Sequence, residues 1–396
     1  MTTRYCPLLL RACCACLAIV LSAGLAYPLS AAEDEDGFVS LFNGKDLDNW
    51  VNINGHPETW SVRDGVIYCT GEPIAMLRTK RHYQNFIIEL EWRHLKPKGN
   101  AGVFVWCDPL PAVGTPFLRG IEVQILDGRE ADWYTSDGDV FPTWGATMEP
   151  ENHRGGMRAF PTEKRVKPSP EWNHYRVTCI DGEISLAVNG KVVTRGKNCT
   201  PRKGYISLES EGSPTEMRNI RIKELPDSPV APEMIADEFN GLVSIFNHLD
   251  LAGWKTDSSD SWKVAGGTLT GDAKSADQSP TIATANAYGD FELRFDWRWP
   301  AKPGKTPAAA ELHLGETPLL KLNAETGGRK QGQWNRYHVW HTDGKLTVVL
   351  NDEKVVDQAE VDIKSEAPLR VVAVSDTIEL RNIFLKEADA AAPHGE

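Results

Sequence analysis

The residues best suited to chemistry lie in the short segment Ile121–Leu126 and directly after it. The apolar residues of this segment alternate with Glu122 and Gln124, and Asp127 follows its last residue. Alternation with a period of two is typical of a β-strand, so Glu122 and Gln124 share one face and apolar side chains occupy the other. A glutamate beside a glutamine on a strand face suits the polar floor of a ligand site, and it equally suits an outer face in water.

The elements that must position these residues belong to a repeated unit. Five segments recur in the same order, which predicts two copies of one domain, residues 37–225 and 237–388. Residues 226–236 contain three prolines and are predicted to form a stiff linker, whereas residues 389–396 are predicted to form a flexible tail. The recurring segments pair 38–50 with 242–254, 60–67 with 262–269, 85–93 with 290–298, 172–177 with 334–339, and 217–224 with 380–387.

The two copies differ most in the stretch between their third and fourth recurring segments, which is far longer in the first copy. A sandwich core does not need the additional residues, and long loops on a rigid scaffold commonly carry function. This extra stretch contains the polar strand, the loop 132–167, and three tryptophans without counterparts, Trp106, Trp133 and Trp144. Its aromatic content favours a ligand site at Glu122 and Gln124 over a solvated face.

Within each copy the pattern is that of strands and tight turns. Residues 86–92 alternate between apolar and acidic side chains, except that Ile87 is also apolar. Asp181-Gly182 and Asn189-Gly190 separate short apolar runs, as in β-hairpins. No stretch shows a sustained helical period. The sequence therefore predicts an all-β protein with two antiparallel β-sandwich domains of the jelly-roll type in tandem.

The N-terminus has the features of a secretory signal peptide, residues 1–32. Arg4 and Arg11 precede the apolar run Cys16–Ala26, and the small residues Ser30 to Ala32 are suited to cleavage. The apolar run is too short to span a bilayer, so no transmembrane anchor is expected and the protein is predicted to be periplasmic or extracellular. The net charge of −12 speaks against a nucleic-acid partner.

Four cysteines follow the predicted signal peptide, Cys69, Cys107, Cys179 and Cys199. An exported protein meets an oxidising compartment, where a disulfide is allowed. The spacings match no zinc pattern. One bridge, with Cys179–Cys199 as the first candidate, and four buried thiols both remain open.

Several motifs of the first copy together resemble the 3-keto-disaccharide hydrolase domain family over most of residues 37–225. The resemblance implies a concanavalin-like β-sandwich that acts on sugars oxidised at position 3. The second copy has Pro307–Asn323 in place of the glycine-asparagine and Glu-Val-Gln strands, so it resembles a degenerate copy without catalysis. The motifs are residues 41–47 with Trp50, Asn85-Phe86 with 91–93, 99–102, 122–127, 171–173, 189–190 and 218–222.

The chemistry that this resemblance implies differs from direct glycoside hydrolysis. A ketone at C3 acidifies the proton on C2, so a base can remove it and the aglycone at C1 leaves by β-elimination, after which water adds to the double bond. This route needs one general base, an acid for the leaving oxygen, and a group or metal that stabilises the enolate. It does not need the paired carboxylates of a retaining glycosidase, and the polar face of the strand 121–126 carries one acid, Glu122.

Nine residues of the first copy are candidates for this chemistry, and each role is a hypothesis. The catalytic candidates are Glu122 as general base or metal ligand, Asp127 as acid or orienting partner, and His153 as second acid/base or ligand. The substrate-binding candidates are Gln124, Asn100, Arg119, Arg154, Trp106 and Trp144. A solvated loop remains the alternative for His153, and core packing for the tryptophans. A divalent ion, Ca²⁺ or another, is compatible with Glu122 and Asp127, but the sequence does not establish one.

The predicted partner is thus an oligosaccharide or glycoside substrate. Two functions of other classes remain as alternatives: a pair of non-catalytic carbohydrate-binding modules, and a structural or adhesive role in which both copies act as spacers. The structural role predicts no polar cleft in the first copy.

Overall fold

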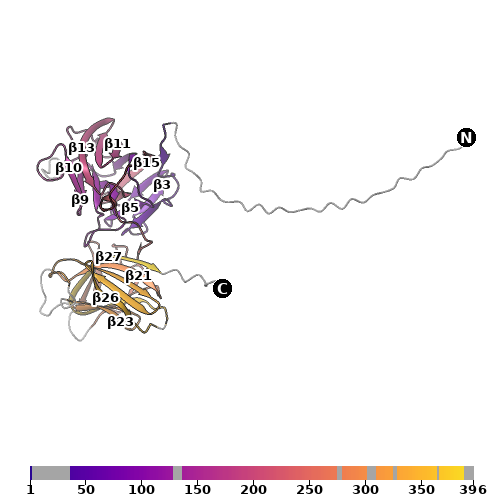
Figure 1. The fold of residues 1–396 in the computed structure, drawn as a ribbon, viewed down its shortest axis with the longest axis vertical. Helices are drawn as coiled ribbons and strands as arrows, with labels where there is room; N and C mark the ends of the chain where they lie inside the picture. The colour runs from indigo at the N-terminus through magenta and orange to yellow at the C-terminus, as the bar shows by residue number, and fades with distance from the viewer. Residues whose placement is uncertain are drawn as a thin grey trace. The chain divides into compact units, whose positions relative to one another are not determined.

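The computed structural model describes Met1 and residues 36–127, 136–273, 279–300, 309–323, 328–363 and 365–387 (Figure 1). Residues 2–32 of the predicted signal peptide, Trp133 and the predicted tail 389–396 lie outside these ranges. Among the described residues, no helix has the length and apolar character needed to cross a membrane. The described residues from 36 onward belong to one compact unit.

Two antiparallel sheets form the first half of the chain. One sheet, called the back sheet here, has the order β10-β13-β12-β11-β6-β15-β4-β3, with β1 paired to β15. Its strands are β1 (Val39–Ser40), β3 (Trp60–Arg63), β4 (Val66–Cys69), β6 (Phe86–His94), β10 (Thr147–Pro150), β11 (Asn173–Ile180), β12 (Glu183–Val188), β13 (Lys191–Thr200) and β15 (Thr215–Glu224).

The other sheet, called the site sheet here, has the order β2-β5-β14-β7-β8-β9. Its strands are β2 (Trp50–Ile53), β5 (Ala75–Thr79), β7 (Asn100–Cys107), β8 (Gly120–Leu126), β9 (Val140–Thr143) and β14 (Tyr205–Ser210). Because β7 lies between β14 and β8, side chains from these three strands meet on one face of the sheet.

The first core lies between the two sheets and follows from the alternation in the sequence. Ile88 and Leu90 on β6, and Val123 and Ile125 on β8, are fully buried members of one apolar cluster. Burying one face of each sheet against the other removes apolar surface from water, which is the main favourable contribution to such a fold. The predicted β-sandwich of the first half is confirmed.

The predicted hairpin turns of the first half are also confirmed. Asp181 (φ 53°) and Gly182 connect β11 to β12, and Asn189 (φ 47°) and Gly190 connect β12 to β13. Both positions of such a turn need the left-handed conformation, which asparagine, aspartate and glycine adopt most readily.

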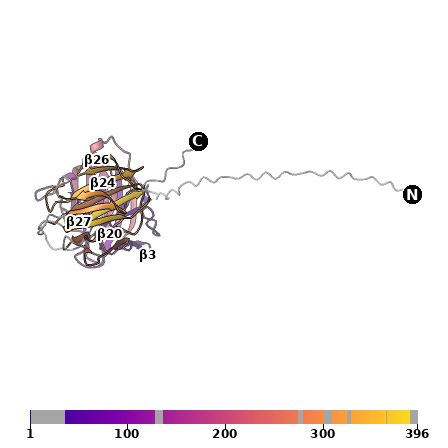
Figure 2. The same ribbon diagram turned by 90° about the horizontal axis from the view of Figure 1, so that it is seen from below.

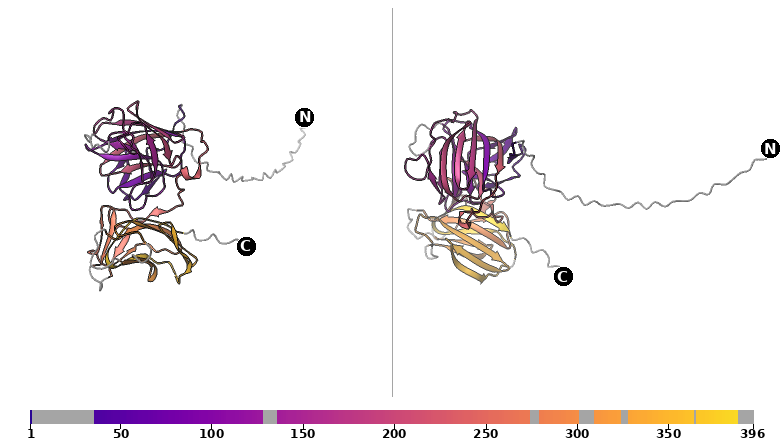
Figure 3. Two further views of the ribbon diagram at one scale, coloured as in Figure 1. Left: turned by 60° about the vertical axis from the view of Figure 1, so that its left-hand side comes forward. Right: turned by 45° about the horizontal axis from the view of Figure 1, so that its top comes forward.

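The second half consists of strands as well, shown in orange to yellow in Figure 3. Neighbouring strands on both sides of β21 are hydrogen-bonded in the order β20-β27-β21-β24-β25-β26. The labelled strands β20, β27, β24 and β26 follow that order in Figure 2. Its strands are β16 (Val243–Ser244), β17 (Trp254–Thr256), β18 (Trp262–Ala265), β19 (Thr268–Ala273), β20 (Thr281–Thr284), β21 (Phe291–Arg298), β22 (Ala309–Leu314), β23 (Thr317–Leu322), β24 (Asn335–Thr342), β25 (Lys345–Leu350), β26 (Glu353–Glu360) and β27 (Leu369–Glu387).

The described part of the segment 307–323 forms strands. Its described residues form a hairpin of β22 and β23, and β22 pairs with β27. Within the described residues, the helical element is a 3₁₀ turn at Pro232–Met234 in the predicted linker, so the predicted all-β class is confirmed.

The four cysteines in the described part of the first half are buried free thiols. Of the two interpretations that the sequence left open, the structure has the one without a Cys179–Cys199 bridge. Burial raises the pKa of the Cys179 thiol well above its ordinary value, so these thiols are core side chains and poor nucleophiles.

Candidate functional site

A cavity of about 670 Å³ lies on the exposed face of the site sheet. Its floor holds polar side chains from neighbouring strands, Asn100 on β7, Glu122 and Gln124 on β8, and Glu209 on β14, with Glu211 directly after that strand. This face was predicted as either a ligand floor or a solvated surface. Glu122, Gln124 and Glu209 are buried at the bottom of a cavity, which is the arrangement of a ligand site.

Glu122 and Glu209 meet above Gly102, which lies on the strand between theirs. A Cβ atom on Gly102 would lie 2.9 Å from Oε2 of Glu209 and 3.1 Å from Oε1 of Glu122. Both carboxyl groups therefore occupy the space that a side chain at position 102 would take. Glycine is needed here because two carboxyl groups approach the backbone closely.

The two carboxyl groups have strongly altered acidities. Burial, with the nearby Glu211 and Asp139, raises the pKa of Glu122 to about 8, against the opposing effect of Arg158. Burial, with the charges of Glu122 and Glu211, raises the pKa of Glu209 well above its ordinary value. Like charges in a desolvated site cannot both ionise at neutral pH. The pair therefore has one group that ionises near neutral pH, Glu122, and one that keeps its proton, Glu209.

A chain of amide contacts fixes the remainder of the floor. The Gln124 amide donates a hydrogen bond to the side-chain oxygen of Asn100, and the Asn100 amide donates one to a carboxylate oxygen of Glu211. Each amide NH₂ group has a second hydrogen for a substrate oxygen. The amides are held in one orientation before any ligand arrives, as a site with preorganised donors requires.

Aromatic side chains form the rim of the cavity. Trp144 is 52% exposed and stacks on Phe117, with an interplanar angle of 13° and ring centroids 6.3 Å apart. Arg158 lies over the ring of Phe141, 3.3 Å from its centroid, and pairs with the buried Asp139 at 3.2 Å. An exposed tryptophan beside polar groups suits the apolar face of a sugar ring.

Four of the predicted site residues line this cavity: Asn100, Glu122, Gln124 and Trp144. Asp127 does not line it. Its position five residues after Glu122 places it on the other face of the strand, where its carboxylate accepts a hydrogen bond from the Ser169 backbone N–H at 3.2 Å. A metal ion shared by Glu122 and Asp127 is therefore disfavoured by the geometry.

The other predicted residues have different neighbours and are not among the residues that line the cavity. Arg119 forms a two-point ion pair with Asp108, at 2.7 and 3.0 Å. Arg154 lies over the ring of Phe160, 4.0 Å from its centroid. His153 is exposed, and its Nδ1 accepts a hydrogen bond from the backbone N–H of Gly155 at 3.2 Å.

The interpretation of Trp106 as a sugar platform is wrong. Its side chain is fully buried in the first core, and its indole N–H donates a hydrogen bond to the carbonyl oxygen of Gln84 at 2.7 Å. A ring without exposed surface cannot stack on a ligand. Of the three tryptophans singled out in the sequence, Trp144 lines the cavity, while Trp133 is outside the described residues.

Glu209 and Glu211 are the site residues that the sequence analysis missed, although a signal for them existed. Gly204 and Ala367 form equivalent bridges to Tyr83 and Tyr288 in the two halves. Counting from these bridges, the second half has valines, Val372 and Val374, at the positions of the two glutamates. The long extra stretch that drew attention to Glu122 does not include residues 209 and 211, but a comparison of the two halves residue by residue would have found them.

The described residues contain no group of three or more histidine, cysteine, aspartate or glutamate side chains placed to hold a metal ion. The carboxyl groups of the cavity are instead arranged as a pair whose two members differ in acidity. Such a pair can take a proton from one atom of a bound molecule and give a proton to another.

Comparisons with known proteins relate both halves of the chain to one family. The family model described as the 3-keto-alpha-glucoside-1,2-lyase-like domain matches residues 37–223, 241–311 and 313–386. The 3-keto-disaccharide hydrolase of Bacteroides thetaiotaomicron is 21% identical over 236 residues, which are 48% of this chain and 80% of that protein.

Among solved structures, a putative glycosyl hydrolase from Parabacteroides distasonis is similar at 24% identity and a TM-score of 0.39, over 48% of this chain and 95% of its own. The carbohydrate binding module CBM66 from Bacillus subtilis is similar at 9% identity and a TM-score of 0.34, over 44% of this chain and 96% of its own. On the family match over both halves, the chain belongs to the 3-keto-alpha-glucoside-1,2-lyase-like domain family.

Proposed function

We propose that this protein is an exported enzyme that cleaves the glycosidic bond of 3-keto-glycosides by removal of the C2 proton and β-elimination at C1. The observation that carries the proposal is the pair Glu122 and Glu209, which meet above Gly102 on the floor of a cavity. Membership of the family and the similarity to a 3-keto-disaccharide hydrolase support the substrate class.

In the proposed reaction Glu122, once ionised, takes the proton from C2 of the oxidised sugar. The electron pair of that bond forms the enolate, with its charge on the C3 oxygen. The C3 carbonyl then re-forms as the C1–O bond breaks, so a double bond appears between C1 and C2. Glu209 gives its proton to the departing oxygen of the aglycone. A base with a pKa near the operating pH and an acid that stays protonated suit these two transfers.

Addition of water completes hydrolysis with the same two groups. Glu209, now ionised, takes a proton from water as the hydroxyl group bonds to C1, and Glu122, whose proton has by then exchanged with solvent water, gives a proton to C2. Both carboxyl groups regain their starting states. The second amide hydrogens of Asn100 and Gln124 are the donors available for the enolate oxygen and the sugar hydroxyls.

We also propose that the two halves are copies of one domain and that the first copy alone is catalytic. In the second half, Glu311 stands at the position that corresponds to Gly102. Its partners on the neighbouring strands, Val372 and Lys321, stand at the positions that correspond to Glu209 and Gln124. A side chain at position 311 fills the space that Gly102 leaves open, and a valine replaces the acid. Export rests on the predicted signal peptide of residues 1–32.

Two substitutions test the assignment of roles. Glu122→Gln is expected to abolish both cleavage of a 3-keto-glycoside and exchange of its C2 proton with solvent. Glu209→Gln is expected to retain C2 exchange while cleavage falls at least tenfold, since loss of a positioned acid costs about 10²–10⁴ in rate. The exposed Glu58 provides a matched control, Glu58→Gln, that changes neither rate. Full cleavage by either site variant would refute its assigned role.

A non-catalytic carbohydrate-binding module is the second candidate function. The observation that favours it is the exposed Trp144 stacked on Phe117 at the rim of the cavity, because exposed aromatic platforms bind sugars without chemistry. Binding of a 3-keto-glycoside by the wild-type protein without any turnover would establish this function instead.

A further inference from the structure

A second cavity of about 760 Å³ continues from the candidate site toward residues of the second half. Asn100, Phe117 and Glu211 line both cavities, so the two spaces are contiguous. The wall that comes from the second half includes Leu249 and Arg381. The size is within the range of small-molecule sites.

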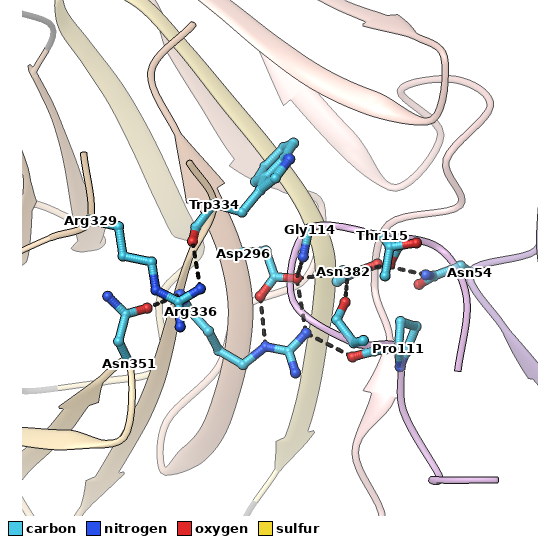
Figure 4. A network of polar contacts seen from close by, with 11 residues as sticks. Asn54, Pro111, Gly114, Thr115, Asp296, Arg329, Trp334, Arg336, Asn351 and Asn382 are labelled. Carbon is cyan, nitrogen blue, oxygen red and sulfur yellow. Dashed lines mark hydrogen bonds and ion pairs between the residues drawn. The ribbon is translucent and has the colours of Figure 1, made fainter. Parts of the chain in front are cut away.

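The second half also holds a loop of the first half whose Phe117 lines both cavities. This loop connects β7 to β8 and carries Phe117. The backbone N–H of Gly114 donates to Oδ2 of Asp296 at 2.8 Å, and Nη1 of Arg381 donates to the Gly114 carbonyl oxygen at 2.8 Å. The side-chain amide of Asn382 donates to the carbonyl oxygen of Thr115 at 2.8 Å. Figure 4 shows part of this network around Gly114 and Thr115.

Two of the anchoring side chains, Asp296 and Asn382, are fully buried. Asp296 is fully buried and accepts hydrogen bonds from Nε and Nη2 of Arg336 at 2.6 and 2.9 Å, and Nη2 also donates to the carbonyl oxygen of Pro111 at 2.8 Å (Figure 4). A Cβ atom on Gly114 would lie 2.2 Å from the ring of Trp334. Charge-assisted hydrogen bonds are stronger than bonds between neutral groups. Those to Gly114 and Pro111 fix the loop, which holds Phe117 at the rim of the site.

We propose that this second cavity, called the groove from here on, is the subsite for the aglycone sugar, with the second half as one of its walls. This inference rests on the proposed function, because the oxidised sugar must place C2 beside Glu122 and its C1 substituent then extends out of the first cavity. The lining of the groove combines two apolar side chains, Leu249 and Pro116, with the hydrogen-bond acceptors of Glu72 and Glu211. A sugar has apolar ring faces and hydroxyl edges, and this wall complements both.

If the groove binds the aglycone sugar, a substitution in the wall from the second half should raise the KM for a disaccharide substrate and leave the KM for a methyl glycoside unchanged. Leu249 is 45% exposed in the groove, and Leu249→Trp would fill part of it. The KM for 3-keto-maltose is expected to rise about tenfold, a loss of one sugar's contacts, while the KM for methyl 3-keto-α-glucoside stays unchanged. Val355 is equally exposed, at 46%, and does not line the groove, so Val355→Trp is the matched control. Equal effects on both substrates, or none on either, would overturn the proposal.

Binding measurements separate this subsite from the proposed reaction. In a Glu122→Gln background, calorimetry with 3-keto-maltose is expected to show about tenfold weaker binding after Leu249→Trp, and Ala265→Trp, at another exposed position of the same wall, is expected to do likewise. Unchanged affinity in both variants would refute the subsite. If the wild-type protein turns over neither substrate, the proposed function fails, and the same comparison with maltose then decides whether the groove binds a sugar.

Discussion

Replacement of Glu122 by glutamine tests the acid–base assignment through the stability of the fold. Burial, Glu211 and Asp139 raise the pKa of Glu122 from 4.5 to about 8 in the folded protein. Between these values the folded state holds a proton that the unfolded chain has released. The stability contributed by the protonated group is complete below about pH 4.5 and is lost as the pH rises through about 8.

The magnitude follows from the size of the shift. At 1.36 kcal/mol per pH unit, ionisation of Glu122 lowers the free energy of unfolding by up to roughly 5 kcal/mol at pH 8.5 relative to pH 4.5. Glutamine has nearly the same shape and does not titrate. Glu122→Gln is therefore expected to be inactive and, at pH 8.5, more stable than the wild type by several kcal/mol, which is an increase in Tm of roughly 10 °C.

The assay is thermal or denaturant unfolding of the wild type and the variant at several pH values from 4.5 to 8.5. The stability difference between the two proteins should grow steadily with pH across this range. Glu58→Gln, at an exposed position, serves as the control and should follow the wild type. Identical pH dependence in wild type and Glu122→Gln would refute the raised pKa, and with it the role of Glu122 as a base that ionises near neutral pH.

Three further outcomes are expected. Because Glu122 must be ionised to act, kcat/KM should rise about tenfold per pH unit up to about pH 8 and level off above it, and a flat profile from pH 6 to 8 would contradict this. Gly102→Ala places a methyl group within 2.9 Å of Glu209 and 3.1 Å of Glu122. Because the methyl group displaces the two carboxyl groups, kcat should fall at least tenfold. An unchanged kcat would show that the spacing of the two carboxyl groups is unimportant. Trp144→Ala should raise KM about fivefold by loss of aromatic stacking without changing Tm, whereas an unchanged KM would remove Trp144 from the substrate site.

The parts of the fold that could be predicted from the sequence are those set by local pattern. Alternation in residues 121–126 identifies a strand with Glu122 and Gln124 on one face, and the structure brings Asn100 and Trp144 to the same cavity. The turn Asn189-Gly190 was predictable because a two-residue hairpin needs residues that adopt positive φ.

The parts that could not be predicted depend on sheet order and local irregularity. Glu209 faces Glu122 because β14 and β8 both flank β7, and a strand's neighbours are not encoded in its own alternation. Trp106 would share the face of Gly102 in a regular strand. Its positive φ of 54° and a register shift beside Phe104 interrupt the alternation, and its ring lies in the core. The contact of Asp127 with Ser169 likewise joins residues from separate parts of the chain.

The proposed reaction is tested most directly by isotope incorporation at C2. The wild-type protein is incubated with a 3-keto-glycoside in D₂O, and the released 3-keto sugar is examined by NMR and mass spectrometry, with substrate kept in D₂O without protein as the control for spontaneous exchange. Removal of the C2 proton, elimination and addition of water predict one deuterium at C2 of the product, introduced at the rate of bond cleavage. Cleavage that leaves the original hydrogen on C2 would contradict elimination and would indicate direct displacement at C1.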